Sequence, residues 1–282
     1  MIKATETNTV YFSELLKTDS RFSLCYENLI AILDRHQISH RLICHTKDIW
    51  CRDYMPIQVG KSKMVQFRYE PSYLKEELNL QSDPLEVCKS NQLEPVFSNI
   101  NLDGGNVVSY GEKAILTDRI FSENPEYTSR NQLISDLENL LEAEVIIIPQ
   151  INSDYTGHAD GMVRFTDSNT LIGNDRAKEY QYWRNGINKV LKQYHLDYID
   201  TPFFTHKIKA FPDNALGCYM NYLEVGNLIV LPRFEVADNC DDEVLELFKR
   251  IFPDRKIESI HYNEVGKYGG LLNCTTWNIR EN

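Results

Sequence analysis

The sequence feature that most constrains the fold is a recurring unit of one helix followed by one strand. Apolar residues at helical spacing predict helices over residues 21–36, 129–144, 179–195 and 241–252. Strand-like runs follow each helix within a few residues, and they read HRLICH, EVIIIP, LDYIDTPF and KIESIHY. Further β patterns occur in KMVQFRY, NVVSY, KAILTD, GMVRF, NTLIG and NYLEVGNLIVLPRF. Because no linker or charge block separates the copies, we expect one α/β domain over residues 1–282, built from a repeated module.

The composition limits the partners of this domain. A formal net charge of −11 repels phosphate backbones, which argues against nucleic acid and favours a small cationic ligand. The start of the chain has no signal-peptide pattern, and no run approaches the ~18 apolar residues of a membrane span. We therefore expect a soluble cytoplasmic protein without membrane association, for which a homodimer is one allowed assembly. Seven cysteines, an odd number without a CxxC pair, argue against a disulfide framework and a cysteine zinc site.

A second regularity lies where the predicted strands meet loops. The segments WCRDYMP, NLDGGNVV, YTGHADGMVRF and GGLLNCTTWN each place a Cys, His or Asp beside Gly or Pro. Loop ends on a rigid scaffold are favoured positions for catalytic residues. If the modules surround a common axis, these four loops converge on one site.

The segment GHADG carries one imidazole and one carboxylate. In a strand, His158 and Asp160 would point to the same face, with Cα atoms about 6–7 Å apart. Histidine is the usual proton carrier near neutral pH. A hydrogen-bonded structural histidine explains the pair equally well, and a metal pair explains it less well because no second histidine cluster accompanies it.

The two segments WCRDYMP and NLDGGNVV are ambiguous when each is taken alone. Arg52 and Asp53 are typical of a surface ion pair, although Trp50 near a carboxylate is also suited to hold a planar cation. Asp103 before two glycines is typical of a turn, and secondly of a carboxylate that the backbone brings close to a ligand.

Cys274 follows the glycine pair Gly269 and Gly270 near the end of the chain. A buried inert thiol is the ordinary interpretation of a single cysteine, but the glycines and the lack of a flanking hydrophobic run favour a reactive one. Acidic residues around a cysteine disfavour a thiolate, yet they suit a cationic substrate. Two carboxylates can hold a guanidinium in bidentate fashion, and its charge then helps the nearby thiol to ionise.

Together the four segments resemble the guanidino-group-modifying superfamily, and most closely its agmatine deiminase and bacterial peptidylarginine deiminase branch. That branch carries WxRDxxP, EGGN, GHxD and a C-terminal GGxxxC in this order, as in WCRDYMP, DGGN, GHAD and GGLLNC here. The segment CYMNYLEVGNLIVLP also resembles the region before the final module of the family. The resemblance implies a single-domain, five-bladed pseudosymmetric α/β propeller of the pentein type, which agrees with the repeated modules.

The resemblance also implies a role for each matching residue. Cys274 becomes the nucleophile, His158 the acid and then the base, and Asp53 and Asp160 the guanidinium clamp. Asp103 becomes the carboxylate that orients His158. Because Asp103 stands where the family usually has the longer Glu, we expect its contact with the histidine to be shifted or bridged by water.

Three further features affect substrate binding. Trp50 is expected as a wall of the site, and Gly270 as a substrate-binding position. Asn273 stands where agmatine deiminases often have His, and the chain is shorter than typical members, which bears on substrate choice.

The implied activity is that of a cytoplasmic hydrolase of polyamine biosynthesis that releases ammonia from agmatine or a related arginine derivative through a covalent thiouronium, without metal or organic cofactor. Three alternatives stay open from the sequence. They are an arginine or peptidylarginine deiminase, an amidinotransferase that passes the amidino group to an amine, and a non-catalytic propeller that serves as a binding module.

Overall fold

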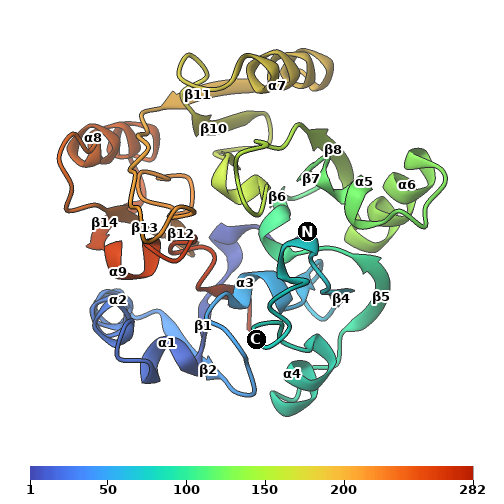
Figure 1. Cartoon of the computed structure of the whole chain (residues 1–282), viewed down its shortest axis with the longest axis horizontal. Helices are drawn as coiled ribbons and strands as arrows, with labels where there is room; N and C mark the ends of the chain where they lie inside the picture. The colour runs from blue at the N-terminus through green and yellow to red at the C-terminus, as the bar shows by residue number, and fades with distance from the viewer. Residues whose placement is uncertain (282) are drawn as a thin grey trace.

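Five three-stranded sheets surround a central axis in the computed structural model, which describes residues 1–281 (Figure 1). This arrangement confirms the expected five-bladed α/β propeller. The strands, in their order across each sheet, are β15 (Trp277–Ile279), β1 (Thr9–Ser13) and β2 (Ser39–Ile43); β3 (Ile57–Gln58), β4 (Met64–Arg68) and β5 (Val96–Asn101); β6 (Val108–Tyr110), β7 (Lys113–Thr117) and β8 (Glu144–Ile148); β9 (Val163–Phe165), β10 (Thr170–Asn174) and β11 (Asp197–Thr201); and β12 (Leu223–Val225), β13 (Leu228–Arg233) and β14 (Lys256–His261).

Every sheet is built in the same way. Its first two strands pair antiparallel, and its second and third pair parallel. A parallel pair needs a crossover connection, and here helices supply it on the outside of the propeller (Figure 1). These crossover helices are α1 (Glu14–Thr18) and α2 (Ser23–Arg35), α4 (Pro84–Ser90), α5 (Arg119–Glu123) and α6 (Arg130–Leu141), α7 (Gln181–Tyr194), and α8 (Asp241–Ile251).

Helical spacing of apolar residues explains how the crossover helices pack. In α7, Trp183, Ile187 and Leu191 recur every four residues and are buried in one cluster with Ile146 of β8. The segments predicted as helices correspond to α2, α6, α7 and α8. The same spacing does not reveal α4, because this helix has only seven residues and its Leu85 is 57% exposed.

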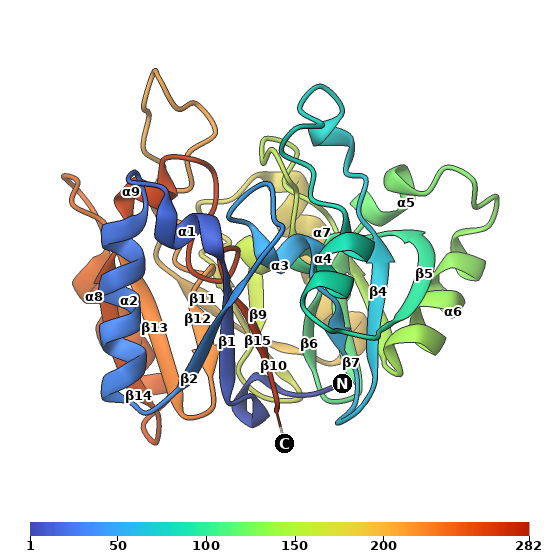
Figure 2. The same ribbon diagram turned by 90° about the horizontal axis from the view of Figure 1, so that it is seen from below.

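The two ends of the chain close the propeller. The N-terminal strand β1 pairs with the C-terminal strand β15, with Val10 opposite Asn278. The chain ends lie together on one side of the molecule, and irregular segments near residues 70–83 and 202–216 rise on the opposite side (Figure 2). Of the helices within residues 1–281, none is long and apolar enough to cross a bilayer.

Five connections lead from the last strand of one sheet to the first strand of the next, and they position the site. Four contain short helices or 3₁₀ turns, and the connection from β11 to β12 is irregular. The short elements are α3 (Cys51–Tyr54), η3 (Gly104–Asn106), η4 (Ala159–Gly161) and α9 (Asn263–Gly266). The segments predicted to carry catalytic residues all lie in these connections.

Candidate active site

At the centre of the site lies His158, which contacts carboxylates with both ring nitrogens. Nε2 lies 2.8 Å from Oδ2 of Asp103, and Nδ1 lies 3.5 Å from Oδ1 of Asp53. His158 is only 3% exposed, so these carboxylates act on the ring with little competition from water. The expectation that His158 and Asp160 lie in a strand is wrong. His158 is the N-cap residue of the 3₁₀ turn η4, which contains Asp160 and precedes β9.

Asp103 makes a direct contact with the histidine, although we expected a shifted or water-bridged one. Its Oδ2 accepts from the hydroxyl of Tyr73 at 2.9 Å and also lies next to His158. Tyr73 belongs to η2 (Ser72–Leu74), in the crossover of the second sheet, and its ring lies edge-on to that of His158 at 6.0 Å. No sequence motif marks this tyrosine, because its position depends on the path of an irregular crossover.

Asp53 is buried, and it does not form the surface pair with Arg52 that is typical of adjacent opposite charges. Its Oδ1 accepts the backbone N–H of Gly105 at 3.1 Å. Arg52 instead points away, and its Nε donates to the carbonyl of Asn273 at 3.3 Å. A short helix, α3, separates the two side chains because consecutive helical residues point in different directions.

The side chains of Asp160 and Cys274 lie next to each other. Oδ2 of Asp160 accepts from Nδ2 of Asn273 at 2.7 Å and lies 3.8 Å from Sγ of Cys274. Asn273 is therefore placed to fix the carboxylate beside the thiol.

The glycine pair before Cys274 has a steric reason. Gly269 adopts φ +101°, which favours glycine, and a Cβ on Gly270 would lie 2.5 Å from the ring of Trp50 and 3.0 Å from Cβ of Cys274. Trp50 thus packs behind the cysteine loop.

A cavity of about 850 Å³ lies next to the Cys274 thiol. His158, Asp160, Gly270 and Cys274 line it, whereas Trp50 is not among the described residues of its wall. The thiol, the imidazole and one carboxylate therefore share a space large enough for a substrate, and the role of Gly270 in substrate binding stays a prediction. The role of Trp50 as a wall of the site stays a prediction.

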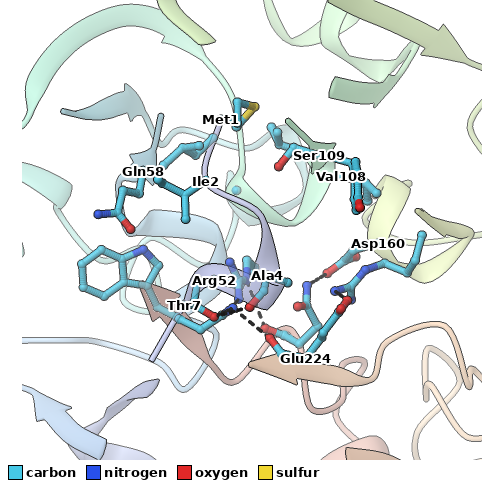
Figure 3. A pocket seen from close by; sticks show the side chains of 18 of the residues that line it. Met1, Ile2, Ala4, Thr7, Arg52, Gln58, Val108, Ser109, Asp160 and Glu224 are labelled. Carbon is cyan, nitrogen blue, oxygen red and sulfur yellow. Dashed lines mark hydrogen bonds and ion pairs between the residues drawn. The ribbon is translucent and has the colours of Figure 1, made fainter. Parts of the chain in front are cut away.

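A smaller pocket of about 110 Å³ is also lined by Asp160 (Figure 3). The N-terminal residues Ala4 and Thr7 line it together with Arg52 and Glu224. Because Asp160 lines both spaces, its side chain forms a wall between the cavity and this pocket. Arg52 thereby places a permanent positive charge behind the acidic centre.

Burial and mutual charge set the protonation of the centre. Burial raises the pKa of Asp53 to about 7, and His158 only partly offsets this shift. Burial alone would lower the pKa of His158, but Asp53 and Asp103 outweigh it and raise the pKa to about 9. Burial, together with Asp160 and Asp53, raises the pKa of the Cys274 thiol well above its ordinary value. Without a cationic ligand the centre therefore favours an imidazolium and a neutral thiol.

Gly105→Ala is expected to inactivate the site without unfolding the chain. A Cβ at this position would lie 2.5 Å from Oδ1 of Asp53 and 2.6 Å from Nδ1 of His158, so both side chains would have to move. We expect ammonia release from guanidino substrates to fall at least about tenfold, since a misplacement near 1 Å is costly in catalysis. Gly60→Ala is the control, because its nearest neighbour would be 3.8 Å away. Equal activity of the two variants would contradict the placement of Gly105.

The family of this chain follows from comparison with known proteins. The model of the Porphyromonas-type peptidyl-arginine deiminase family matches residues 2–279, and the chain belongs to this family.

Individual relatives are distant in sequence. A candidate agmatine deiminase of Mycoplasma mycoides subsp. mycoides SC is 23% identical over 223 residues, which span 68% of this chain and 60% of that relative. An agmatine deiminase of C. jejuni, solved with substrate bound, is similar to this chain with a TM-score of 0.79 at 17% identity, over 100% of this chain and 96% of the other. A candidate arginine deiminase of Porphyromonas gingivalis has a TM-score of 0.80 at 17% identity, over 100% and 98%. At these identities the structural likeness establishes the fold.

The sequence motifs did not assign a role to every residue that the structure brings to the centre. Asn221, on the connection from β11 to β12, contacts Cys274. The segment CYMNYLEVGNLIVLP pointed to this region, but only the folded connection shows which of its side chains reaches the thiol.

Proposed function

We propose that this chain is a deiminase that hydrolyses a C–N bond in the guanidinium group of agmatine or a related arginine derivative. The observation that carries the proposal is that the thiol of Cys274, the imidazole of His158 and the carboxylate of Asp160 line one cavity. Two further buried carboxylates, those of Asp53 and Asp103, contact the imidazole. Family membership supports the same reaction class.

The first half of the reaction forms a covalent intermediate. Asp53 and Asp160 accept N–H bonds from the planar guanidinium, and its positive charge offsets the carboxylates that disfavour a thiolate. The thiol proton of Cys274 passes to solvent when the cation binds, and the resulting thiolate attacks the central carbon to form a C–S bond. The imidazolium of His158 gives a proton to the departing nitrogen, the C–N bond breaks, and ammonia leaves a thiouronium on the enzyme.

The second half consumes one water molecule. His158, now neutral, takes a proton from this water while its oxygen attacks the thiouronium carbon. The C–S bond then breaks, the second proton of the water passes to the sulfur to restore the thiol, and the ureido product leaves. Asp103 holds the ring of His158 in one orientation during both proton transfers, as the 2.8 Å contact supports.

The competing reaction classes are separated by one measurement. Ammonia released in the absence of any amine acceptor supports the deiminase, whereas product formation only with an acceptor identifies an amidinotransferase. Failure of agmatine, arginine, N-acylarginine and arginine peptides to yield ammonia would favour a binding module.

For the substrate we expect a higher kcat/KM with agmatine than with free arginine. Asp154 and Glu179 line the cavity, and a Cβ on Gly161, next to Asp160, would lie 3.9 Å from Oδ2 of Asp154. These acids attract the distal ammonium of agmatine, whereas the α-carboxylate of arginine would be repelled. Initial rates with both substrates on one preparation decide the matter, and an arginine value tenfold higher, about 1.4 kcal/mol, would overturn the choice.

Asp154→Asn tests the origin of this preference. Oδ1 of Asp154 accepts the backbone N–H groups of Thr156 and Gly157, and an asparagine keeps that acceptor while it removes the charge. We expect this variant to lose kcat/KM for agmatine and to keep it for an N-acylated guanidinoalkane that lacks the ammonium.

A peptide with a terminal arginine is the second candidate substrate. Lys178, Lys207 and Lys209 line the same cavity and are exposed, so they are suited to a carboxylate at the outer end of a longer ligand. The volume of about 850 Å³ also leaves room beyond a guanidinoalkylamine. A kcat/KM for such a peptide above that for agmatine would favour this candidate.

A further inference from the structure

Asn221 contacts the nucleophilic cysteine at two atoms. Its Oδ1 accepts the backbone N–H of Cys274 at 3.1 Å, and its Nδ2 lies 3.1 Å from Sγ of the same residue. The backbone N–H can only donate, so the amide oxygen must face it and the amide nitrogen must face the sulfur. Asn221 is 4% exposed, so this orientation is shielded from water.

The surroundings of the sulfur make such a donor important. Oδ2 of Asp160 lies 3.8 Å from Sγ, and a carboxylate at this distance disfavours a thiolate. A lysine beside the sulfur would stabilise the thiolate, but it would also repel the guanidinium that the proposed reaction requires. A neutral amide N–H can donate to the thiolate without repelling a cation.

We propose that Asn221 is a positioning residue that fixes the Cys274 side chain and stabilises its thiolate through the N–H of its amide. This inference rests on the proposed function for its catalytic consequence, whereas its effect on the thiol can be measured without turnover. It also gives the connection from β11 to β12 a part in the site, so that all five connections of the propeller contribute to one centre.

A purely structural role for Asn221 predicts a different outcome. Its backbone carbonyl accepts the N–H of Asn273 at 3.1 Å, and this contact is kept whatever side chain stands at position 221. In Asn221→Asp, one carboxylate oxygen still accepts the N–H of Cys274, but the donor to the sulfur is replaced by a negative charge, so Asn221→Leu is the variant that removes the donor without adding charge. If the side chain served only the backbone, the neutral leucine would not raise the pKa of the Cys274 thiol.

The test is the rate of alkylation of Cys274 by iodoacetamide as a function of pH, followed by mass spectrometry of the peptide that contains this residue. The charged groups around the thiol are unchanged in every variant; they are Asp53, Asp160, Arg52 and His158. The nearby phenol of Tyr262 is neutral because burial raises its pKa. We expect Asn221→Asp and Asn221→Leu each to raise the pKa of Cys274 by at least about one unit, which is a tenfold slower alkylation below that pKa. The aspartate is expected to have the larger effect because it also adds a negative charge.

Asn124→Asp provides the matched control. Asn124 is also a buried asparagine, and its amide nitrogen donates to the carbonyls of Asn101 and Ile120, away from Cys274. This variant should alkylate at the wild-type rate, even if its thermal unfolding temperature falls.

Two results would overturn the inference. The first is an Asn221→Leu variant whose Cys274 alkylates as fast as the wild type. The second is a loss of alkylation in Asn124→Asp as large as that in Asn221→Asp. In an active enzyme we further expect the Asn221 variants to lose kcat with little change in KM. A wild-type protein that releases no ammonia from any guanidino compound would refute the proposed function, whereas the alkylation profiles would still decide the role of Asn221.

Discussion

Cys274→Ser is expected to reduce ammonia release by several orders of magnitude, to the background of the assay. A serine hydroxyl is far harder to ionise than a thiol, and Asp160, with its Oδ2 3.8 Å from Sγ, makes an anion at this position still less favourable. The expected loss therefore falls on kcat, while binding of the cationic substrate is largely kept. Steady-state rates and the equilibrium binding of agmatine to the variant provide the two measurements.

Cys218→Ser is the matched control for this prediction. Cys218 lines the same cavity, and its Sγ contacts the carbonyl of Gly161 at 3.4 Å. Burial and the nearby Asp154 raise the pKa of Cys218 to about 12, so it is a neutral thiol at physiological pH. We expect this variant to keep activity. Substantial ammonia production by Cys274→Ser would contradict the covalent mechanism, as would the absence of a substrate adduct on wild-type Cys274 after a rapid acid quench.

The propeller could be predicted from the sequence because its repeated unit leaves a periodic signal. Long amphipathic helices such as α7 and β-branched strands such as β8 bury regular apolar faces, and these patterns survive without any long-range information. The closing strands β1 and β15 are not predicted, because their pairing joins residues at opposite ends of the chain. The short helix α4 carries too few turns to show a period.

The candidate site was predicted as far as its motifs extend. Glycines beside Asp103 and Cys274 pointed to close backbone approach, and the structure places both loops at the axis. Tyr73 and Asn221 have no such local signal. Tyr73 lies in an irregular crossover and Asn221 in an irregular connection between two sheets. Each side chain reaches the centre through contacts between residues distant in sequence, which leave no local pattern.

The contacts of Arg52 also could not be predicted from the sequence. Sequence adjacency favoured a pair with Asp53, whereas the helical turn of α3 sends the two side chains to different sides of the centre. The carboxylate of Asp53 lies beside the ring of His158, and Arg52 lines the small pocket that Asp160 also lines.

The second large effect on activity is expected from substitutions in the proposed guanidinium clamp, Asp53 and Asp160. Asp53→Asn and Asp160→Asn are each expected to cost about 3 kcal/mol in transition-state stabilisation, on the order of a hundredfold in kcat/KM, because each removes a charge-assisted hydrogen bond in a buried site. For Asp53 a pH effect accompanies the loss. With a pKa raised to about 7, its carboxyl becomes protonated as the pH falls below this value and can no longer pair with the guanidinium. The kcat/KM of the wild type should therefore decline below about pH 7, and this decline should be missing in Asp53→Asn.

Asp48→Asn separates the clamp from a general effect of buried acids. Asp48 is also buried near Asp53, but its Oδ1 accepts the N–H of Trp50 at 2.8 Å, and burial raises its pKa to about 8. It is therefore largely protonated at neutral pH, where an asparagine resembles it, and we expect nearly unchanged kcat/KM. Equal losses in Asp48→Asn and Asp53→Asn would contradict a specific clamp. Chelators should leave the wild type active, because a clamp of carboxylates binds a guanidinium without a metal ion. Recovery of the Asp160→Asn variant on addition of a divalent metal would instead favour a metal site at His158 and Asp160.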